Sequence, residues 1–285
     1  MSALEDKLRQ RAAELLQSGE VACVIGWENG RFENQTTPCF VSDPDDVGRL
    51  VYNRHCVNAL GKYVLDYRNK GKVALCTRGC ESRAINRMIE DNQLKREDVY
   101  LLGLPCDGMV YRHDENQMLK KCAECRHQAP VVFDEMLAEA GPDRIPENRF
   151  GMVERLENMS RDTREQEFEN IFSKCIRCYA CRDVCPCCTC RICFVDQRRA
   201  GWQGKQNNLN ENRFYGLTRA FHIGDRCIEC GECERVCPMN LPLMLINRKL
   251  IKDMNELFGE FESGMDTNNA DVMRNYKLDD VEEFM

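Results

Sequence analysis

The chain has 285 residues, of which 31% are charged and 43% hydrophobic, as in an ordinary globular protein of one or two domains. Its formal net charge of −7, without a basic stripe, argues against nucleic-acid binding. No run reaches the ~20 apolar residues of a bilayer span, so we expect neither a membrane span nor a signal peptide.

The chain contains twenty cysteines, an unusually large number. Without an export signal, they predict thiolate–metal chemistry in a reducing compartment rather than a disulfide scaffold. Because exposed iron–sulfur clusters are generally oxygen-sensitive, we expect the protein in an anaerobic cytoplasm.

The N-terminal segment is predicted to begin a small α/β domain. Its first residues carry an amphipathic helical pattern, and residues 21–27 read as a buried strand. Residues 31–44 are predicted to be a loop. Apolar spacing after Asp43 predicts a helix that runs to about Tyr67.

A βαβ unit follows. Residues 72–77 and 99–104 are predicted strands, and residues 81–91 are the helix between them, so the strands should be parallel. Cys80 and Cys106 each come just after a strand. Because ligands gather at the carboxyl ends of parallel strands, we expect these two thiols to face one crevice.

A C-x2-C pair comes shortly afterwards and completes a set of four thiols. We predict a [4Fe–4S] cluster, the third of this chain, on Cys80, Cys106, Cys122 and Cys125. The N-terminus of the helix at Cys80 would favour the negative charge of such a cluster. Two alternatives remain open: zinc on the same residues, with His127 in place of one of them, or a redox thiol pair at Cys76 and Cys80.

The next segment is predicted to be a helix, a linker and a second helix. Residues 130–139 are predicted to be helical, with Pro130 near the first turn. Residues 141–150, with two prolines, read as a linker. Residues 154–172 favour a charged helix with a solvated face.

Two cysteine runs then share the spacing C-x2-C-x2-C-x3-C-P, which binds [4Fe–4S] clusters in bacterial-type ferredoxins. In proteins with two such runs, the fourth cysteine of each ligates the cluster of the other. The first cluster is therefore assigned to Cys175, Cys178, Cys181 and Cys237, and the second to Cys227, Cys230, Cys233 and Cys185. A four-cysteine zinc site is the alternative, although it usually uses two separated C-x2-C pairs.

The two runs differ in the charge of their neighbours. Lys174, Arg177 and Arg182 accompany the first, whereas the second carries three glutamates, Glu229, Glu232 and Glu234. Because net charge near a cluster affects its reduction potential, we expect the first cluster to be the easier to reduce.

Four further cysteines follow the first run at once: Cys187, Cys188, Cys190 and Cys193. They either hold an additional metal centre or pack as small residues against the clusters. Residues 198–212 are a polar insertion between the two runs, and we expect them to form a docking surface or to cover a cluster.

The C-terminal part is predicted to be a helix, residues 241–257, followed by an acidic tail. The tail, residues 259–285, carries apolar residues to its last position, which favours an arm that wraps a neighbouring subunit over a disordered end. We therefore predict an α+β or α/β fold, with a βαβ-containing cluster domain, a two-cluster ferredoxin-like domain and helical extensions. The predicted divisions are an α/β domain (1–145), a linker with a charged helix (146–172), a dicluster domain (173–245), and a helix with a partner-binding tail (246–285).

These motifs resemble a known family. Gly79-Cys80, the segment 103–106 and Cys122-x2-Cys125 are similar to the beta subunits of deazaflavin (coenzyme factor 420)-reducing hydrogenases and deazaflavin-linked formate dehydrogenases. The order, with a two-cluster ferredoxin module in the same chain, resembles the formate dehydrogenase type. The resemblance implies a cluster on the four thiols of the crevice and a flavin, FAD. However, only about seventy residues precede the βαβ unit here, and the chain has no Gly-x-Gly-x-x-Gly fingerprint.

We conclude from the sequence that the chain is an iron–sulfur electron-transfer subunit of an anaerobic oxidoreductase complex, and we name no catalytic residue. Its partners would be a hydrogenase or dehydrogenase catalytic subunit and a flavin-bearing or heterodisulfide-reductase-like subunit. One alternative is a flavin-containing subunit that itself reduces a deazaflavin or nicotinamide. The other is a zinc-binding interaction module without redox activity.

Overall fold

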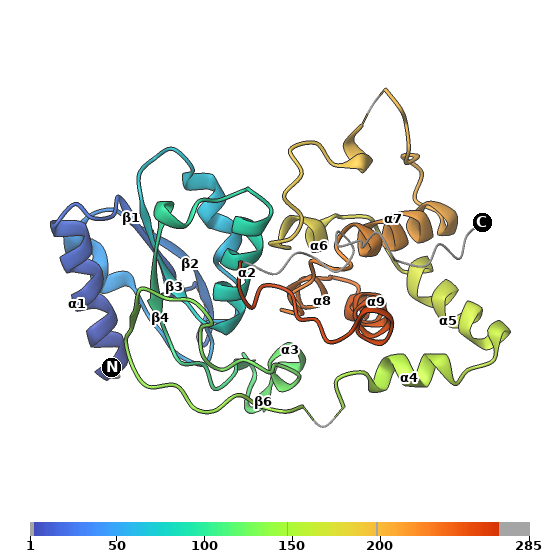
Figure 1. Cartoon of the computed structure of the whole chain (residues 1–285), viewed down its shortest axis with the longest axis horizontal. Helices are drawn as coiled ribbons and strands as arrows, with labels where there is room; N and C mark the ends of the chain where they lie inside the picture. Colours follow the sequence, from blue (N-terminus) through green and yellow to red (C-terminus); the bar gives the residue numbers. More distant parts are fainter. Residues whose placement is uncertain (1–2, 147, 198, 268–285) are drawn as a thin grey trace.

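The computed structural model describes residues 3–146, 148–197 and 199–267. A mixed α/β part, built around a five-stranded sheet, lies beside a part made of helices and cysteine-bearing turns (Figure 1). In the described ranges, no helix is long and apolar enough to cross a membrane. The mixed α/β fold expected from the sequence is therefore confirmed.

The sheet has the order β2-β1-β3-β4-β7. Its central strands β1 (Cys23–Asn29), β3 (Val73–Thr77) and β4 (Val99–Gly103) are mutually parallel. The βαβ pattern predicted this for β3 and β4. Both β3 and β4 are buried along their whole length, which is typical of parallel strands covered on two faces.

The prediction of a loop over residues 31–44 was wrong. Strand β2 (Thr36–Val41) pairs antiparallel with β1 and forms one edge of the sheet. Pro38 lies inside it. An edge strand tolerates proline because one side of its backbone needs no hydrogen-bond donor. The prediction of a loop did not take this into account.

The predicted helix over residues 43–67 was also wrong. The segment forms two 3-10 helices, η1 (Pro44–Arg49) and η2 (Gly61–Tyr67), which are separated by a loop. Val51 bridges to Trp27 of β1, and the Trp27 indole donates to the carbonyl oxygen of Asn58 (2.9 Å). The apolar residues therefore pack on the sheet edge without helical spacing.

Two helices flank the sheet on opposite sides (Figure 1). Helix α1 (Ala3–Gln17) buries Leu8, Ala12 and Leu15, as its amphipathic pattern predicts. Helix α2 (Gly79–Glu90) is the predicted crossover helix between β3 and β4. The 3-10 turn η3 (Arg96–Asp98) then leads into β4. Nine of the twelve α2 residues are buried, so this helix is covered on its outer face too.

A hairpin and a short strand complete the α/β part. Strands β5 (Val110–Tyr111) and β6 (Asp114–Met118) pair antiparallel, and the short helix α3 (Lys120–Ala123) follows. Residues 130–139 are not helical, contrary to the prediction. They form bends and a short strand, β7 (Glu135–Met136), which pairs parallel with β4 because the sheet edge offers unpaired backbone groups.

The second part contains mainly helices. The predicted charged helix over 154–172 is broken into α4 (Gly151–Glu157) and α5 (Arg161–Ser173), because the Ser160 hydroxyl accepts from the N–H of Thr163 and starts a new helix. The turns of the two cysteine runs are followed by α6 (Ala180–Asp183) and α8 (Glu232–Arg235). The turn η4 (Phe194–Asp196), α7 (Leu209–His222) and α9 (Leu243–Phe258) complete it.

The chain returns to the α/β part after α9. The carbonyl oxygens of Ser263 and Gly264 accept hydrogen bonds from Arg83 and Asn86 of α2 (2.8 and 3.0 Å). The first residues of the predicted tail thus cover the outer face of α2 within this chain. The predicted arm beyond residue 267 lies outside the described residues.

Candidate iron–sulfur sites

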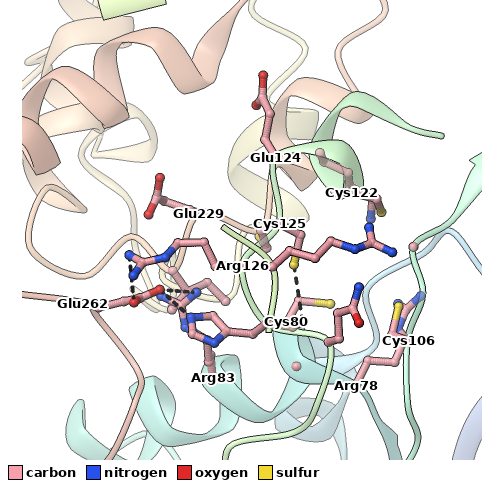
Figure 2. Close-up of a pocket in the computed structure, with 18 of the residues that line it drawn as sticks. Arg78, Cys80, Arg83, Cys106, Cys122, Glu124, Cys125, Arg126, Glu229 and Glu262 are labelled. Atoms are coloured by element: carbon pink, nitrogen blue, oxygen red, sulfur yellow. Dashed lines mark hydrogen bonds and ion pairs between the residues drawn. The ribbon is translucent and has the colours of Figure 1, made fainter. Parts of the chain in front are cut away.

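The βαβ unit brings one predicted ligand set to a single cavity. Cys80, Cys106, Cys122 and Cys125 all line it, and Figure 2 shows their side chains on different walls. Cys122 is buried and the other three are half-buried. The structure therefore places in one crevice both the thiols at the strand ends and the C-x2-C pair.

Close backbone packing holds these thiols in place. Because β3 ends at Thr77 and α2 starts at Gly79, Cys80 lies in the first turn of α2. A side chain at position 79 would lie 2.5 Å from the carbonyl oxygen of His127, so only glycine allows this approach. The Cys106 N–H donates to the carbonyl oxygen of Gln128 (2.9 Å), which joins the same segment to the end of β4.

Buried charges surround the cavity. The Arg78 guanidinium pairs with Glu81 (2.7 Å) while both side chains are almost fully buried, and Lys121 also lines the cavity. Burial raises the pKa of the Cys80 thiol well above its ordinary value, and the Glu81 carboxylate adds to this effect while Arg78 opposes it. The Cys80 thiol therefore keeps its proton at neutral pH unless a bound metal replaces it.

The zinc and redox-thiol alternatives have less support at this cavity. Both ring nitrogens of His127 face carboxylates, Asp143 at 3.2 Å and Glu262 at 2.6 Å. Cys76 is fully buried within β3 and does not line the cavity. Zinc needs its ligand atoms at about 2.0–2.3 Å from one point. Over the described ranges, no three His, Cys, Asp or Glu side chains converge in that way. Four thiols around a cavity suit a cluster, which takes one thiolate at each iron.

A second cavity contains the first ferredoxin set. Cys175, Cys178, Cys181 and Cys237 line it together, so the fourth cysteine of the second run lies with the first three of the first run. Helix α7, which begins within the predicted insertion, closes one side of this cavity. Its Asn212 amide donates to the carbonyl oxygen of Cys175 (2.8 Å), and the Tyr215 hydroxyl lies 3.4 Å from the Cys181 sulfur.

In the second ferredoxin set, Cys185 of the first run interacts with the three thiols of the second run. Burial, and to a smaller extent the proximity of Cys185, raises the pKa of Cys227, Cys230 and Cys233. Cys185 therefore lies close enough to the three thiols of the second run to interact with each of them. Three of the set are buried and Cys230 is half-buried, so water has little access.

The two runs fold into the same turn. Arg177 and Tyr179 of the first have positive φ angles of 49° and 61°, and the equivalent Glu229 and Gly231 of the second have 55° and 65°. Each turn continues into a helix of four residues, α6 or α8. The repeated spacing therefore corresponds to a repeated backbone shape that points three sulfur atoms inward.

Two of the predicted sites are direct neighbours. Cys230, a member of the second ferredoxin set, also lines the cavity of Cys80, Cys106, Cys122 and Cys125. Lys121 forms a buried ion pair with Glu232 across this junction, and its ammonium also donates to the carbonyl oxygen of Val57 (2.8 Å). Sequence reasoning missed this pair because nothing along the chain indicates that residues 121 and 232 meet.

The remaining cysteines occupy a different place. Cys187, Cys188, Cys190 and Cys193 line a third cavity, between η2, α6 and α7. Arg219 of α7 lines this cavity and the cavity of the first ferredoxin set, and it too was missed in the sequence.

Comparisons with known proteins relate this chain to iron–sulfur proteins. A model of the 4Fe-4S dicluster domain matches residues 171–241. The F420-dependent formate dehydrogenase subunit beta of Methanocaldococcus jannaschii is 22% identical over 335 aligned positions, which cover 86% of this chain and 88% of that protein. Because the alignment is longer than the 285 residues of this chain, that relative has segments that are missing here.

Two further relatives are similar over smaller regions. The F420-dependent formate dehydrogenase 1 subunit beta of Methanococcus maripaludis is 22% identical over 64% of this chain and 71% of its own length. One protein of the ion-translocating oxidoreductase complex of Buchnera aphidicola is 32% identical, but over only 28% of this chain and 15% of its own length.

Proposed function

We propose that this chain, a relative of the beta subunits of F420-dependent formate dehydrogenases with a 4Fe-4S dicluster domain, is the iron–sulfur electron-transfer subunit of an anaerobic oxidoreductase complex. The family resemblance predicted from its motifs is confirmed by the two formate dehydrogenase relatives. The observation that carries the proposal is the adjacency of its thiol sets, because Cys230 belongs to one set and lines the cavity of another.

Three sets of cysteines would hold the cofactors. They are Cys80, Cys106, Cys122 and Cys125; Cys175, Cys178, Cys181 and Cys237; and Cys227, Cys230, Cys233 and Cys185. When bound, [4Fe–4S] clusters accept and release single electrons. Around the first set, the buried cations Arg78 and Lys121 line the cavity, and each is paired with a buried carboxylate, Glu81 and Glu232 respectively.

The partners would be a catalytic hydrogenase or dehydrogenase subunit on one side and a flavin-bearing or heterodisulfide-reductase-like subunit on the other. The names of the relatives support this, since each belongs to a redox enzyme or complex. All twenty cysteines are free thiols in the structure, which fits a reducing compartment such as an anaerobic cytoplasm.

Iron and acid-labile sulfide analysis of the anaerobically purified chain tests the proposal. Cys106→Ala should remove about four irons per chain, because a [4Fe–4S] cluster needs all four ligand positions. Cys76→Ala is the matched control, since Cys76 is a cysteine of the adjacent strand that lines no cluster cavity. Equal iron in both variants, or zinc in place of iron, would contradict the proposal.

The flavin-bearing alternative stays a prediction of the family resemblance. Denaturation of the purified chain with acid would release a bound flavin, and its fluorescence would then identify FAD. A stoichiometric amount would favour a subunit that itself reduces a deazaflavin or nicotinamide.

A further inference from the structure

The third cavity is larger than the two thiol-lined cavities described above. Its volume is about 550 Å³, and Cys187, Cys188, Cys190 and Cys193 all line it. Cys187 is buried, Cys188 and Cys193 are half-buried, and Cys190 is exposed. These are four thiols within seven residues, and none of them belongs to the three sets described above.

The walls of this cavity are positively charged. Six cationic side chains and three carboxylates line it. Among the cations, Arg219 is only 6% exposed and its Nε has no hydrogen-bond partner. The Arg182 guanidinium pairs with Asp183 (2.9 Å) and Asp196 (2.8 Å) and also interacts with the Cys193 thiol. The need for an anionic partner is therefore inferred from Arg219. A buried guanidinium without a full set of partners is costly, so the charge balance here suits an anionic occupant.

We propose that Cys187, Cys188, Cys190 and Cys193 bind a fourth iron–sulfur cluster at the wall of this cavity. Cys188, Cys190 and Cys193 would supply three thiolates from one short segment, although their spacing, C-x-C-x2-C, is tighter than the C-x2-C-x2-C of the two ferredoxin runs. Cys187 would supply the fourth, and its S–H, which donates to the carbonyl oxygen of Arg226 (2.9 Å), would lose its proton to iron binding.

Iron, rather than a single soft metal ion, suits the surroundings of these thiols. Thiolate ligands select zinc, copper(I) or iron–sulfur clusters. Cys187 and Cys188 contact Cys185 of the second ferredoxin set, so a cluster here would extend a group of thiols already predicted to hold iron.

The position of this centre gives it a role in the proposed electron-transfer function, on which this step rests. Cys185 of the second ferredoxin set contacts both Cys187 and Cys188. Further along the turn, Cys190 is exposed. A cluster here would therefore connect the buried second cluster to the surface between η2 and α7, where a redox partner could approach.

A double variant tests the site. In Cys190→Ala/Cys193→Ala, two ligands on the outer part of the turn are removed with little effect on the core. We expect about sixteen irons per chain in the wild type and a loss of about four in the variant, with the EPR signals of the other clusters retained. Thr189→Ser is the matched control, because Thr189 lies on the same turn and lines the same cavity.

The outcomes are distinguishable from failure of the proposed function. About twelve irons in both proteins would overturn the fourth cluster and leave the other three intact. One zinc per chain, lost in the double variant, would also overturn it. A chain without iron would overturn the proposed function itself.

A measurement on the unmodified chain guards against misfolding of the variant. The exposed Cys190 thiol should be protected from iodoacetamide in the anaerobic protein and should react after iron is removed by a chelator. Prompt alkylation of Cys190 in the iron-loaded protein, detected by peptide mass spectrometry, would overturn the proposal.

Discussion

The ion pair between Lys121 and Glu232 joins the two parts of the molecule at the level of single residues. Glu232 is fully buried, yet Lys121 and Arg235 both donate to its carboxylate. Burial alone would raise the pKa of Glu232, but these cations lower it to about 2. The carboxylate is therefore charged at neutral pH, and each of its partners depends on it.

We predict that Glu232→Gln lowers the free energy of unfolding by about 3–5 kcal/mol, since it leaves the buried Lys121 ammonium without its anion. Lys121→Met should cost less, because Glu232 keeps Arg235. Anaerobic denaturant titration measures both. The control is Lys95→Met, which removes an exposed pair with Glu97 and should change nothing measurable. A smaller loss for Glu232→Gln than for Lys121→Met would contradict this interpretation.

The charges near the ferredoxin runs could be predicted only in part from the sequence, because their ion-pair partners are distant along the chain. Glu229 pairs with Arg149 and Arg248, and Glu234 pairs with Lys120. All three cations are distant in sequence, so a local count of charge could not include them. The expected difference in reduction potential between the two clusters remains a prediction, but its physical basis is weaker than the sequence indicated.

At the scale of elements, the turn of the second run depends on Gly231. Its φ angle is +65°, and a Cβ there would lie 2.5 Å from the Cβ of Lys121. Gly231→Ala should therefore cost more than the roughly 1–2 kcal/mol of left-handed strain alone, because Lys121 must also move. Gly201→Ala is the control, with φ +60° and no atom within 4 Å. Equal losses of unfolding free energy in the two variants would show that the contact with Lys121 is unimportant.

The segment after α9 is a second element with a specific anchor. Glu262 binds His127 (2.6 Å), Arg83 (3.1 Å) and Arg126 (3.2 Å), and Arg149 is also near. Burial would raise the pKa of Glu262, but the hydrogen bond from His127 and these cations lower it to about 2. Because the unfolded value is about 4.3, this stabilisation is complete above that pH and is lost as pH falls toward 2.

Glu262→Gln should therefore lower the free energy of local unfolding of residues 259–267 at pH 7 by at most about 3 kcal/mol. Hydrogen exchange of the Phe261 amide, which donates to the Asn255 side chain (3.0 Å), measures the effect. Glu260→Gln, at an exposed position, is the control. Unchanged protection in Glu262→Gln would mean that the contacts of Ser263 and Gly264 with α2 hold the segment without this carboxylate.

Elements with regular spacing could be predicted, and elements defined by distant partners could not. The alternation of β3, α2 and β4 and the spacing of the cysteine runs are local properties, and both predicted where the thiols lie. Strand β7 is defined by its pairing with β4, and the segment over α2 by its hydrogen bonds to that helix. Their own sequences carry no periodic pattern from which these contacts could be predicted.

At the scale of the whole molecule, three of the thiol groups form a connected series. Cys230 joins the cavity of Cys80 to the second ferredoxin set, and Cys185 joins that set to the turn that starts at Cys187. The sequence predicted the members of each set but not their order in space, because the order depends on how α2, α3 and α8 pack together.

The most direct test of the account is a reductive titration of the anaerobically purified full chain, followed by low-temperature EPR. Adjacent clusters should take up at least three electrons per chain, and the signals should be broadened by magnetic interaction between neighbours. A chain that takes up no electrons, or fewer than three with sharp and independent signals, would contradict the account.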